Sequence, residues 1–318
     1  MPTPLLLQLP TDRPFDVAGL GQNSVDLVAR VPVFPEANSK HRLASFSRLP
    51  GGQVASALVC CARLGWRARY VGRFGDDEPG RLGWESLEGE RVDMTAAQVV
   101  PGARTRFAIV LVDERSGERT VLWDRDRRLS IAPDEVPSDA VRSARILLVD
   151  AEDLAASARA AEIARGAGTV TVVDVETAEP GVEQLLRHID VMIVSEHFPE
   201  QLTGMAAPGR ALEQLARQFG PAVACVTLGA DGCLARSDGR EIHSPAYPVQ
   251  CADSTGAGDA FRGGFISALL ATDGRAVLED VLHYANAVAS LACRRPGARA
   301  GLPRRGEVDE LLVRSGPD

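Results

Sequence analysis

The sequence predicts an α/β fold with a mainly parallel central sheet. Short apolar runs rich in β-branched residues alternate along the chain with longer amphipathic runs, which is the pattern of βαβ units. The 318 residues contain no internal repeat, low-complexity linker or long charged tail. We therefore expect one domain over residues 1–318, since a chain of this length can bury a sizeable core.

The elements are expected in a regular order. "FDVAGL" is a first strand, and the later "RILLVD" and "TVTVVDV" have the apolar character of buried strands. "QVASALVCCARLG" predicts a helix that ends at its glycine, and the alanine-rich "LAASARAAEIARGAG" predicts another. The expected strands lie at 15–20, 68–75, 145–150, 169–175, 190–195 and 221–229, and two long helices at about 257–272 and 277–294 close the chain.

Two early stretches interrupt this alternation. Residues 28–49 and 105–123 have the pattern of strands and hairpins, and "ERSGE" in the second stretch predicts a turn. We expect them to form a small antiparallel sheet that projects from the main one. Ligands of open α/β sheets bind beyond the C-terminal strand ends, so such a sheet is placed to act as a lid over them.

The composition narrows the class of partner. The formal net charge is −8 and the arginines are scattered among acids, which argues against nucleic acid and for a small molecule. The N-terminal stretch has no basic region that would indicate a signal peptide, and no apolar run approaches membrane-spanning length. The six cysteines form no C-x-x-C pair and fit reduced, buried thiols. We expect a cytoplasmic protein without a membrane partner.

Two nucleotide-binding motifs are excluded. Of 35 basic residues only Lys40 is lysine, and its neighbours do not form the P-loop pattern G-x-x-x-x-G-K-[ST]. Gly19 and Gly21 lack the third glycine of a dinucleotide-binding fingerprint, because Ser24 stands at that position.

The stretch "DSTGAGDAF" (253–261) is the strongest chemical motif. Gly256, Ala257 and Gly258 at a helix start would leave backbone N–H groups exposed at the positive end of the helix dipole, which is an anion site. Asp259 directly after them either caps the helix or accepts the proton of a hydroxyl that attacks a bound phosphoryl group. The motif alone leaves both interpretations open.

Three further stretches accompany this motif: "GLGQNSVDLV" at the end of the first strand, "PGGQVASALVCCARLG" at 50–65 and "VTLGADGCL" at 226–234. In this order, and with the closing "ANAVASLACRRPGARAGLP", the chain resembles the ribokinase-type (PfkB) carbohydrate kinases from about residue 15 to 303. The resemblance implies a three-layer α/β/α fold and phosphorylation of a sugar hydroxyl by ATP with Mg²⁺.

The resemblance also assigns roles to residues. It implies that Asp259 is the general base and that the amides of Gly256, Ala257 and Gly258 hold the charge on the transferred phosphoryl group. Substrate contacts are expected from Asn23, Asp26, Gly51, Gly52 and Ser56. Nucleotide contacts are expected from Thr227, Gly229, Gly232 and Asn286, and Asp253 is expected beside a monovalent cation such as K⁺. Asn23 and Asp26 could equally be structural turn residues.

The chain departs from the family pattern at two places. Ser56 stands where the family usually has Asn, which implies a different substrate contact. Ser195 and Phe198 replace the two functional residues of the N-x-x-E motif that organises magnesium. Glu196 or Glu200 could serve instead, although each fits an ordinary carboxylate at a helix start. Magnesium is still expected with ATP because it needs few protein ligands.

Lys40 is a further candidate for substrate binding, since its compact ammonium lies in the expected lid; the alternative is a solvated surface charge. We also expect a homodimer through the lid strands, because pairing would bury their edges. The expected activity is that of an ATP-dependent sugar kinase. The alternatives are a nucleoside kinase, with Phe34, Phe46, Phe107 or Trp123 as a platform for the base, and a regulator that binds ligand without catalysis.

Overall fold

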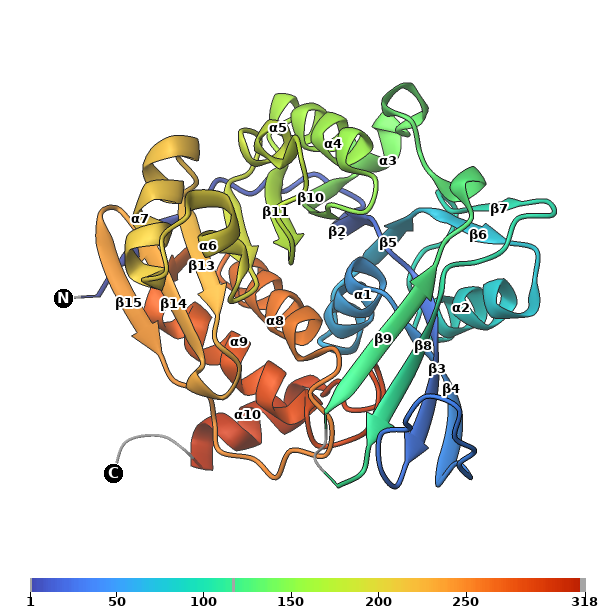
Figure 1. Cartoon of the computed structure of the whole chain (residues 1–318). Coiled ribbons are helices and arrows are strands. Elements are labelled where there is room, and N and C mark those ends of the chain that lie inside the picture. Colours follow the sequence, from blue (N-terminus) through green and yellow to red (C-terminus); the bar gives the residue numbers. More distant parts are fainter. Residues whose placement is uncertain (1, 116–117, 315–318) are drawn as a thin grey trace.

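A sheet of eight strands forms the centre of the part of the protein that the computed structural model describes, residues 2–115 and 118–314 (Figure 1). The strand order is β15-β14-β13-β12-β11-β10-β2-β5, parallel from β13 to β5 and antiparallel at β14 and β15. The strands are β2 (Phe15–Leu20), β5 (Ala68–Val71), β10 (Ala144–Asp150), β11 (Val170–Val175), β12 (Val191–Val194), β13 (Val223–Thr227), β14 (Cys233–Ser237) and β15 (Arg240–Ser244). The mainly parallel sheet predicted from the sequence is confirmed.

Helices cover both faces of this sheet, because successive side chains of a buried strand point to opposite sides. In β10, Ile146 and Leu148 join the core under α1, α8 and α9, whereas Leu147 and Val149 join the core under α4, α5, α6 and α7. The three-layer arrangement follows from this division. The helices are α1 (Gln53–Arg63), α2 (Glu78–Gly89), α3 (Ser138–Arg142), α4 (Leu154–Gly166), α5 (Val182–Leu186), α6 (Phe198–Thr203), α7 (Pro208–Phe219), α8 (Ala257–Ala271), α9 (Leu278–Ala292) and α10 (Arg305–Arg314).

A second sheet of four strands, here called the lid, stands beside the central one in the order β4-β3-β8-β9 (Figure 1). Its strands are β3 (Ser24–Val31), β4 (Ser45–Gly51), β8 (Phe107–Asp113) and β9 (Arg119–Asp124). The two hairpins are antiparallel as expected, but β3 and β8 between them pair in parallel. Of the expected "ERSGE" turn, Ser116 and Gly117 lie outside the described residues.

Some smaller elements differ from the expectation. The predicted strand at 68–75 is divided into β5 and β6 (Arg73–Gly75), and β6 pairs with β7 (Gln98–Val100). β1 (Pro4–Leu6) pairs with β16 (Arg275–Val277). The prediction that α8 and α9 close the chain is wrong, because α10 follows them. In the described part of the chain, no helix is both long enough and apolar enough to cross a membrane.

Candidate active site

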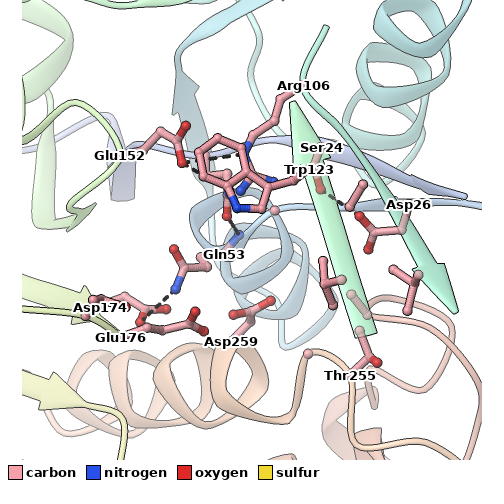
Figure 2. A pocket seen from close by; sticks show the side chains of 18 of the residues that line it. Ser24, Asp26, Gln53, Arg106, Trp123, Glu152, Asp174, Glu176, Thr255 and Asp259 are labelled. Carbon is pink, nitrogen blue, oxygen red and sulfur yellow. Dashed lines mark hydrogen bonds and ion pairs between the residues drawn. The ribbon is translucent and has the colours of Figure 1, made fainter. Parts of the chain in front are cut away.

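A cavity of about 340 Å³ lies between the C-terminal ends of β10 and β11 and the inner face of the lid (Figure 2). This is the edge of a parallel sheet at which ligands bind, because loops from several strands meet there. The lid contributes one wall, the residues that follow the strands contribute another, and the starts of α1 and α8 form the floor. The lining residues include Ser24, Asp26, Arg106 and Trp123; Glu152, Asp174 and Glu176; and Gly52, Gln53, Gly256 and Asp259.

Asp259 occupies the first turn of α8 and faces the cavity (Figure 2). Burial, followed by the negative charge of Asp174, raises the pKa of Asp259 well above its ordinary value, and Arg262 opposes the rise. The capping alternative is not supported, because Gly256 is the N-cap residue and, within the described chain, no side chain caps this helix. The carboxylate is therefore available to a ligand.

Of the glycines before Asp259, Gly256 is required by the backbone, whereas Gly258 is restricted only by a neighbouring side chain. Gly256 has φ 78°, a left-handed conformation that favours glycine, and a Cβ there would stand 2.7 Å from Cα of Ala298. A Cβ on Gly258 would stand 2.6 Å from Nη1 of Arg262. The N–H of Ala257 already donates to the carbonyl of Ser254 at 3.2 Å, so it is less open to a ligand than the motif suggested.

A buried ion pair supports the floor of the site. Nη2 of Arg262 lies 2.7 Å from Oδ1 of Asp174, and their side chains are 3% and 1% exposed. Gln53 donates to the same oxygen, whereas Oδ2 of Asp174 has no hydrogen-bond partner among the described residues (Figure 2). Burial raises the pKa of Asp174, and Arg262 opposes that rise. An acidic group near Asp259 thus keeps one oxygen unpaired among the described residues.

Sequence reasoning missed the acids of this wall. Asp150 ends β10, Glu152 follows it, and Asp174 and Glu176 stand at the end of β11. A signal was present, because the predicted strands "RILLVD" and "TVTVVDV" end in or next to acids and parallel strands bring these ends to one edge. Burial raises the pKa of Asp150 to about 7, although hydrogen bonds from the backbone N–H groups of Gln22 and Glu152 act to lower it.

On the lid wall, Asp26 and Ser24 lie side by side, and Oγ of Ser24 donates to Oδ1 of Asp26 at 3.0 Å. Burial raises the pKa of Asp26, against that hydrogen bond and the charge of Arg106. The predicted partner Asn23 points elsewhere: its Nδ2 donates to the Tyr70 hydroxyl and to the carbonyl of Arg73. Ser24 and Asp26 share one face of β3, whereas Asn23 precedes the strand, which explains the correction.

The upper wall carries a stacked cation. The guanidinium of Arg106 lies 4.7 Å from the ring centre of Trp123, and its Nε lies 3.5 Å from Oε2 of Glu152 (Figure 2). The Trp123 side chain is 60% exposed although it lines the cavity. It therefore offers a ligand an open aromatic edge above polar walls.

The glycine pair of the N-terminal motif lies where the lid meets α1. Gly52 lines the cavity with φ 96°, and a Cβ there would stand 2.5 Å from Cα of Asn23. Gly51 lies behind it, where its carbonyl accepts from Nη2 of the buried Arg299 at 2.6 Å. Nε of Arg299 donates to Oγ of Ser56 at 3.3 Å. Ser56 is thus fully buried against Arg299 and does not line the cavity, contrary to the expectation of a substrate contact.

A second cavity, of about 420 Å³, meets the first at the start of α8. Ser254 and Ala257 line the second cavity, while Thr255, Gly256 and Asp259 line the first. Its other walls are mainly apolar and include Ala246, Tyr247, Pro248, Val249, Gly229 and Asn286. The two cavities thus lie on either side of one helix N-terminus.

The predicted nucleotide residues lie in or behind this second cavity. Gly229 and Asn286 line it, and Nδ2 of Asn286 donates to both oxygens of Ser244 at 3.0 Å, which holds the wall in place. Gly232 lies behind the wall, where a Cβ would collide with the carbonyl of Ser244. Oγ1 of Thr227 faces the carbonyl of Val194 at 3.4 Å and does not line the cavity.

The remaining candidates lie outside both cavities. Lys40 is exposed in the segment between β3 and β4, and Glu196 and Glu200 are exposed around the start of α6. The two oxygens of Asp253 accept from the amides of Thr255 and Gly297, each at 2.9 Å. Burial would raise the pKa of Asp253, but these hydrogen bonds hold it below its ordinary value. In the described chain, no set of three or more His, Cys, Asp or Glu side chains is arranged to hold a metal.

Two cavities on either side of one helix start suit an enzyme that transfers a group between two ligands. The comparisons with known proteins agree with this arrangement. A model of the "pfkB family carbohydrate kinase" matches residues 15–305. Fructokinase-1 of Zea mays is 29% identical over 94% of this chain and 98% of its own, and the nucleoside kinase of Methanothermobacter thermautotrophicus is 29% identical over 92% and 94%. The structure of Arabidopsis thaliana ribokinase with ribose and ATP is similar with a TM-score of 0.82, 25% identity and coverage of 94% and 98%.

The chain belongs to the pfkB family of carbohydrate kinases. The resemblance inferred from the motifs is confirmed, and so are the ribokinase-like fold and the class of enzyme.

Proposed function

We propose that the protein transfers the γ-phosphoryl group of ATP to a hydroxyl of a sugar or sugar-like alcohol held beneath the lid, within a single kinase domain. The observation that carries this proposal is the meeting of two cavities at the N-terminus of α8, with Asp259 on the side of the polar cavity. The base of ATP would fill the apolar second cavity, and its phosphates would cross the helix start toward Asp259. Backbone N–H groups and the helix dipole favour anions there.

Asp259 is the proposed general base. A carboxylate whose pKa is raised by burial is a better proton acceptor than an exposed one, and it must be ionised to act. The amides of Gly256 and Gly258 would stabilise the charge that develops on the phosphoryl oxygens. The amide of Ala257 would contribute only after release from its bond to Ser254. Catalysis by such a site is chiefly positioning and electrostatic stabilisation.

Magnesium is proposed to enter with ATP. The chemistry of the donors fits, because Asp174 and Glu176 line the first cavity and one buried oxygen of Asp174 has no partner among the described residues. Mg²⁺ is commonly bound by one or two carboxylates together with substrate phosphates and water, and it would neutralise charge on the transferred group. Glu196 and Glu200 are exposed and line neither cavity, so we favour Asp174 and Glu176 at the end of β11. A monovalent cation beside Asp253 is also proposed, since its low pKa keeps that carboxylate charged.

The walls of the first cavity favour a polyhydroxylated substrate. Ser24 and Asp26 on the lid, with Gln53 on the floor, offer acceptors and donors to hydroxyl groups. Unpaired buried polar groups cost about 1 to 3 kcal/mol each, so a ligand rich in hydroxyls would be preferred. A nucleoside is the second candidate, because Trp123 and Val121 form an apolar strip on the same lid wall.

We also propose that the protein works in the cytoplasm as a homodimer that pairs through its lids. Along β9, an edge strand of the lid, each residue from Arg119 to Asp124 is exposed, and Val121 and Leu122 are 47% and 56% exposed. Unpaired edges with apolar side chains favour association with a second copy.

The experiment that tests the proposed function is a coupled assay of ADP release with Mg²⁺ and ATP. Ketoses, aldoses, sugar acids, sugar phosphates and nucleosides serve as separate acceptors. ADP release that requires one acceptor class, with a matching phosphorylated product by mass spectrometry, supports the proposal. A nucleoside accepted more than about tenfold better than any sugar, as kcat/KM, would favour the second candidate. Failure of all five classes, with ATP shown to bind, would favour a regulator without catalysis.

A further inference from the structure

Two cysteines meet in the wall of the second cavity, and we call them the thiol pair. Cys251 lies in the loop between β15 and α8, and Cys293 is the first residue after α9. Both line the cavity in which the base of ATP is proposed to bind. Two distant segments of the chain thus bring two thiols to one hollow.

The backbone places the thiol pair side by side. The N–H groups of Ala252 and Asp253 both donate to the carbonyl of Cys293, at 2.8 and 3.2 Å. Burial raises the pKa of Cys293 to about 11, and the charge of Cys251 and a hydrogen bond with its side chain act in the same direction. The side chains are therefore neighbours as well. A disulfide requires adjacent backbones and side chains that approach each other, and the thiol pair offers both.

The thiol pair differs from the other cysteines in its access to solvent. Four of the six cysteines are buried, as the sequence predicted, and line neither cavity: Cys60, Cys61, Cys225 and Cys233. Cys251 is exposed, contrary to the expectation of buried thiols, and Cys293 is half-buried. Because exposure favours oxidation of a cysteine, an oxidant in solution reaches Cys251 first and finds Cys293 beside it.

The chemistry needs only a peroxide as the oxidant. The sulfur of Cys251 attacks one peroxide oxygen, the O–O bond breaks, and a sulfenic acid and one water form. The sulfur of Cys293 then attacks the sulfenic sulfur. The S–S bond forms, the S–O bond breaks, and the hydroxyl leaves with the proton of Cys293 as a second water. The two thiols lose two electrons in all, and hydrogen peroxide is reduced to two waters.

The loop that carries Cys251 also shapes the second cavity. Pro248 and Val249 of this loop line the cavity, and Ala289 and Ser290 line it from α9. A disulfide would fix these two walls to each other. The base of ATP must fit between them, so walls that can no longer adjust are expected to hold it less tightly.

We propose that Cys251 and Cys293 form a reversible disulfide in the presence of a peroxide, and that this bond weakens the binding of ATP in the second cavity. The disulfide follows from the thiol pair alone, whereas its effect on ATP rests on the proposed function. A dithiol reductant reverses the bond by thiol–disulfide exchange. Because coupling between two equilibria is reciprocal, bound ATP should disfavour the disulfide at redox equilibrium.

Formation of the disulfide is tested without substrates. The wild type, Cys251→Ser and Cys293→Ser are treated with hydrogen peroxide, the remaining thiols are alkylated, and the peptides are mapped by mass spectrometry without reduction. The control is Cys225→Ala, which removes a buried thiol of β13 and leaves the thiol pair in place. Circular dichroism and melting of the reduced proteins establish that the variants fold.

A peptide that links Cys251 to Cys293 within one chain is expected in the wild type and the control, and it should disappear after treatment with dithiothreitol. Cys293→Ser is expected to stop at the sulfenic acid of Cys251, which dimedone traps. Cys251→Ser should give neither product. If Cys251 of the wild type stays unoxidised, proceeds to sulfinic acid without a link, or links only to a second chain, the proposal is overturned.

The effect on nucleotide is measured by calorimetry with ATP and Mg²⁺. The oxidised wild type and control are expected to bind ATP weaker than their reduced forms by a factor of about ten or more, whereas peroxide should leave the affinity of Cys251→Ser unchanged. In a buffer of reduced and oxidised dithiothreitol, ATP should lower the fraction of disulfide in the wild type.

The outcomes separate the two parts of the proposal from the proposed function. Equal ATP affinity of the oxidised and reduced wild type would overturn the effect on nucleotide binding. Failure of the reduced wild type to bind ATP would instead count against the proposed function, and the peptide map would still decide whether the disulfide forms.

Discussion

The buried pair of Arg262 and Asp174 leads to a prediction for stability. In the wild type the side chains of Arg262 and Asp174 are 3% and 1% exposed. Arg262→Gln removes the cation and leaves the carboxylate of Asp174 buried beside Asp259. Breaking one partner of a buried ion pair costs about 3 to 5 kcal/mol. For a chain of 318 residues, unfolding entropy of about 2.1 cal/mol/K per residue converts this loss into a fall in melting temperature of about 4 to 8 °C.

The pH dependence identifies the cause. Burial already raises the folded-state pKa of Asp174, and loss of Arg262 raises it further. A carboxyl group with a raised folded pKa binds more protons in the folded state, so stability falls as pH rises from the unfolded pKa to the folded one. The deficit of Arg262→Gln should therefore be largest at pH 8 and shrink as the solution is acidified and Asp174 takes up a proton.

Urea unfolding of the wild type, Arg262→Gln, Asp174→Asn and the double variant, at several pH values, is the assay. The double variant should recover part of the loss, because it leaves neither charge unpaired. A deficit below about 1 kcal/mol, or one that stays constant from pH 5 to pH 8, would refute the reasoning, since a solvent-screened pair behaves in that way.

Three further predictions concern activity. Asp26→Asn should lower kcat/KM for the acceptor about tenfold or more, because it weakens charge-assisted hydrogen bonds to a hydroxyl, while KM for ATP stays the same. A variant in which only KM for ATP changes would contradict the placement of Asp26 in the acceptor site. Glu176→Gln should raise the magnesium concentration needed for half-maximal rate, whereas Glu196→Gln and Glu200→Gln should not. If a magnesium titration gives the same increase for all three variants, Glu196 and Glu200 remain candidates for magnesium binding. Activity should fall on acidification through the raised pKa of Asp259, since the base must be ionised; a profile of kcat/KM that is flat down to pH 4 would exclude that role.

Local sequence patterns predicted the central sheet well, because a buried parallel strand is an almost continuous apolar run. The strand "RILLVD" appears as β10, and the helix predicted at 257–272 appears as α8. The lid was placed in the right part of the chain, but its central pairing could not be predicted. Val25 and Phe107 are partners in a parallel pair although 82 positions separate them, and no local pattern carries that information.

The site was predicted where a motif concentrates the chemistry and missed where distant residues decide it. Asp259 and its glycines could be found in one short stretch. Ser56 was misplaced because Arg299, 243 positions later, fills the space beside it. Asn23 was misplaced for a simpler reason, since strand alternation already favoured Ser24 as the neighbour of Asp26.

The central claim is that Asp259 accepts the proton of the acceptor hydroxyl, and Asp259→Asn tests it most directly. Its neutral amide avoids both the burial of a charge and the repulsion with Asp174, which together raise the pKa of Asp259, so the variant should be as stable as the wild type or more stable. Calorimetry should show the same affinity for ATP as in the wild type, while kcat should fall by a factor of about 10² to 10⁴. A variant that folds, binds ATP and turns over within about tenfold of the wild type would contradict the account.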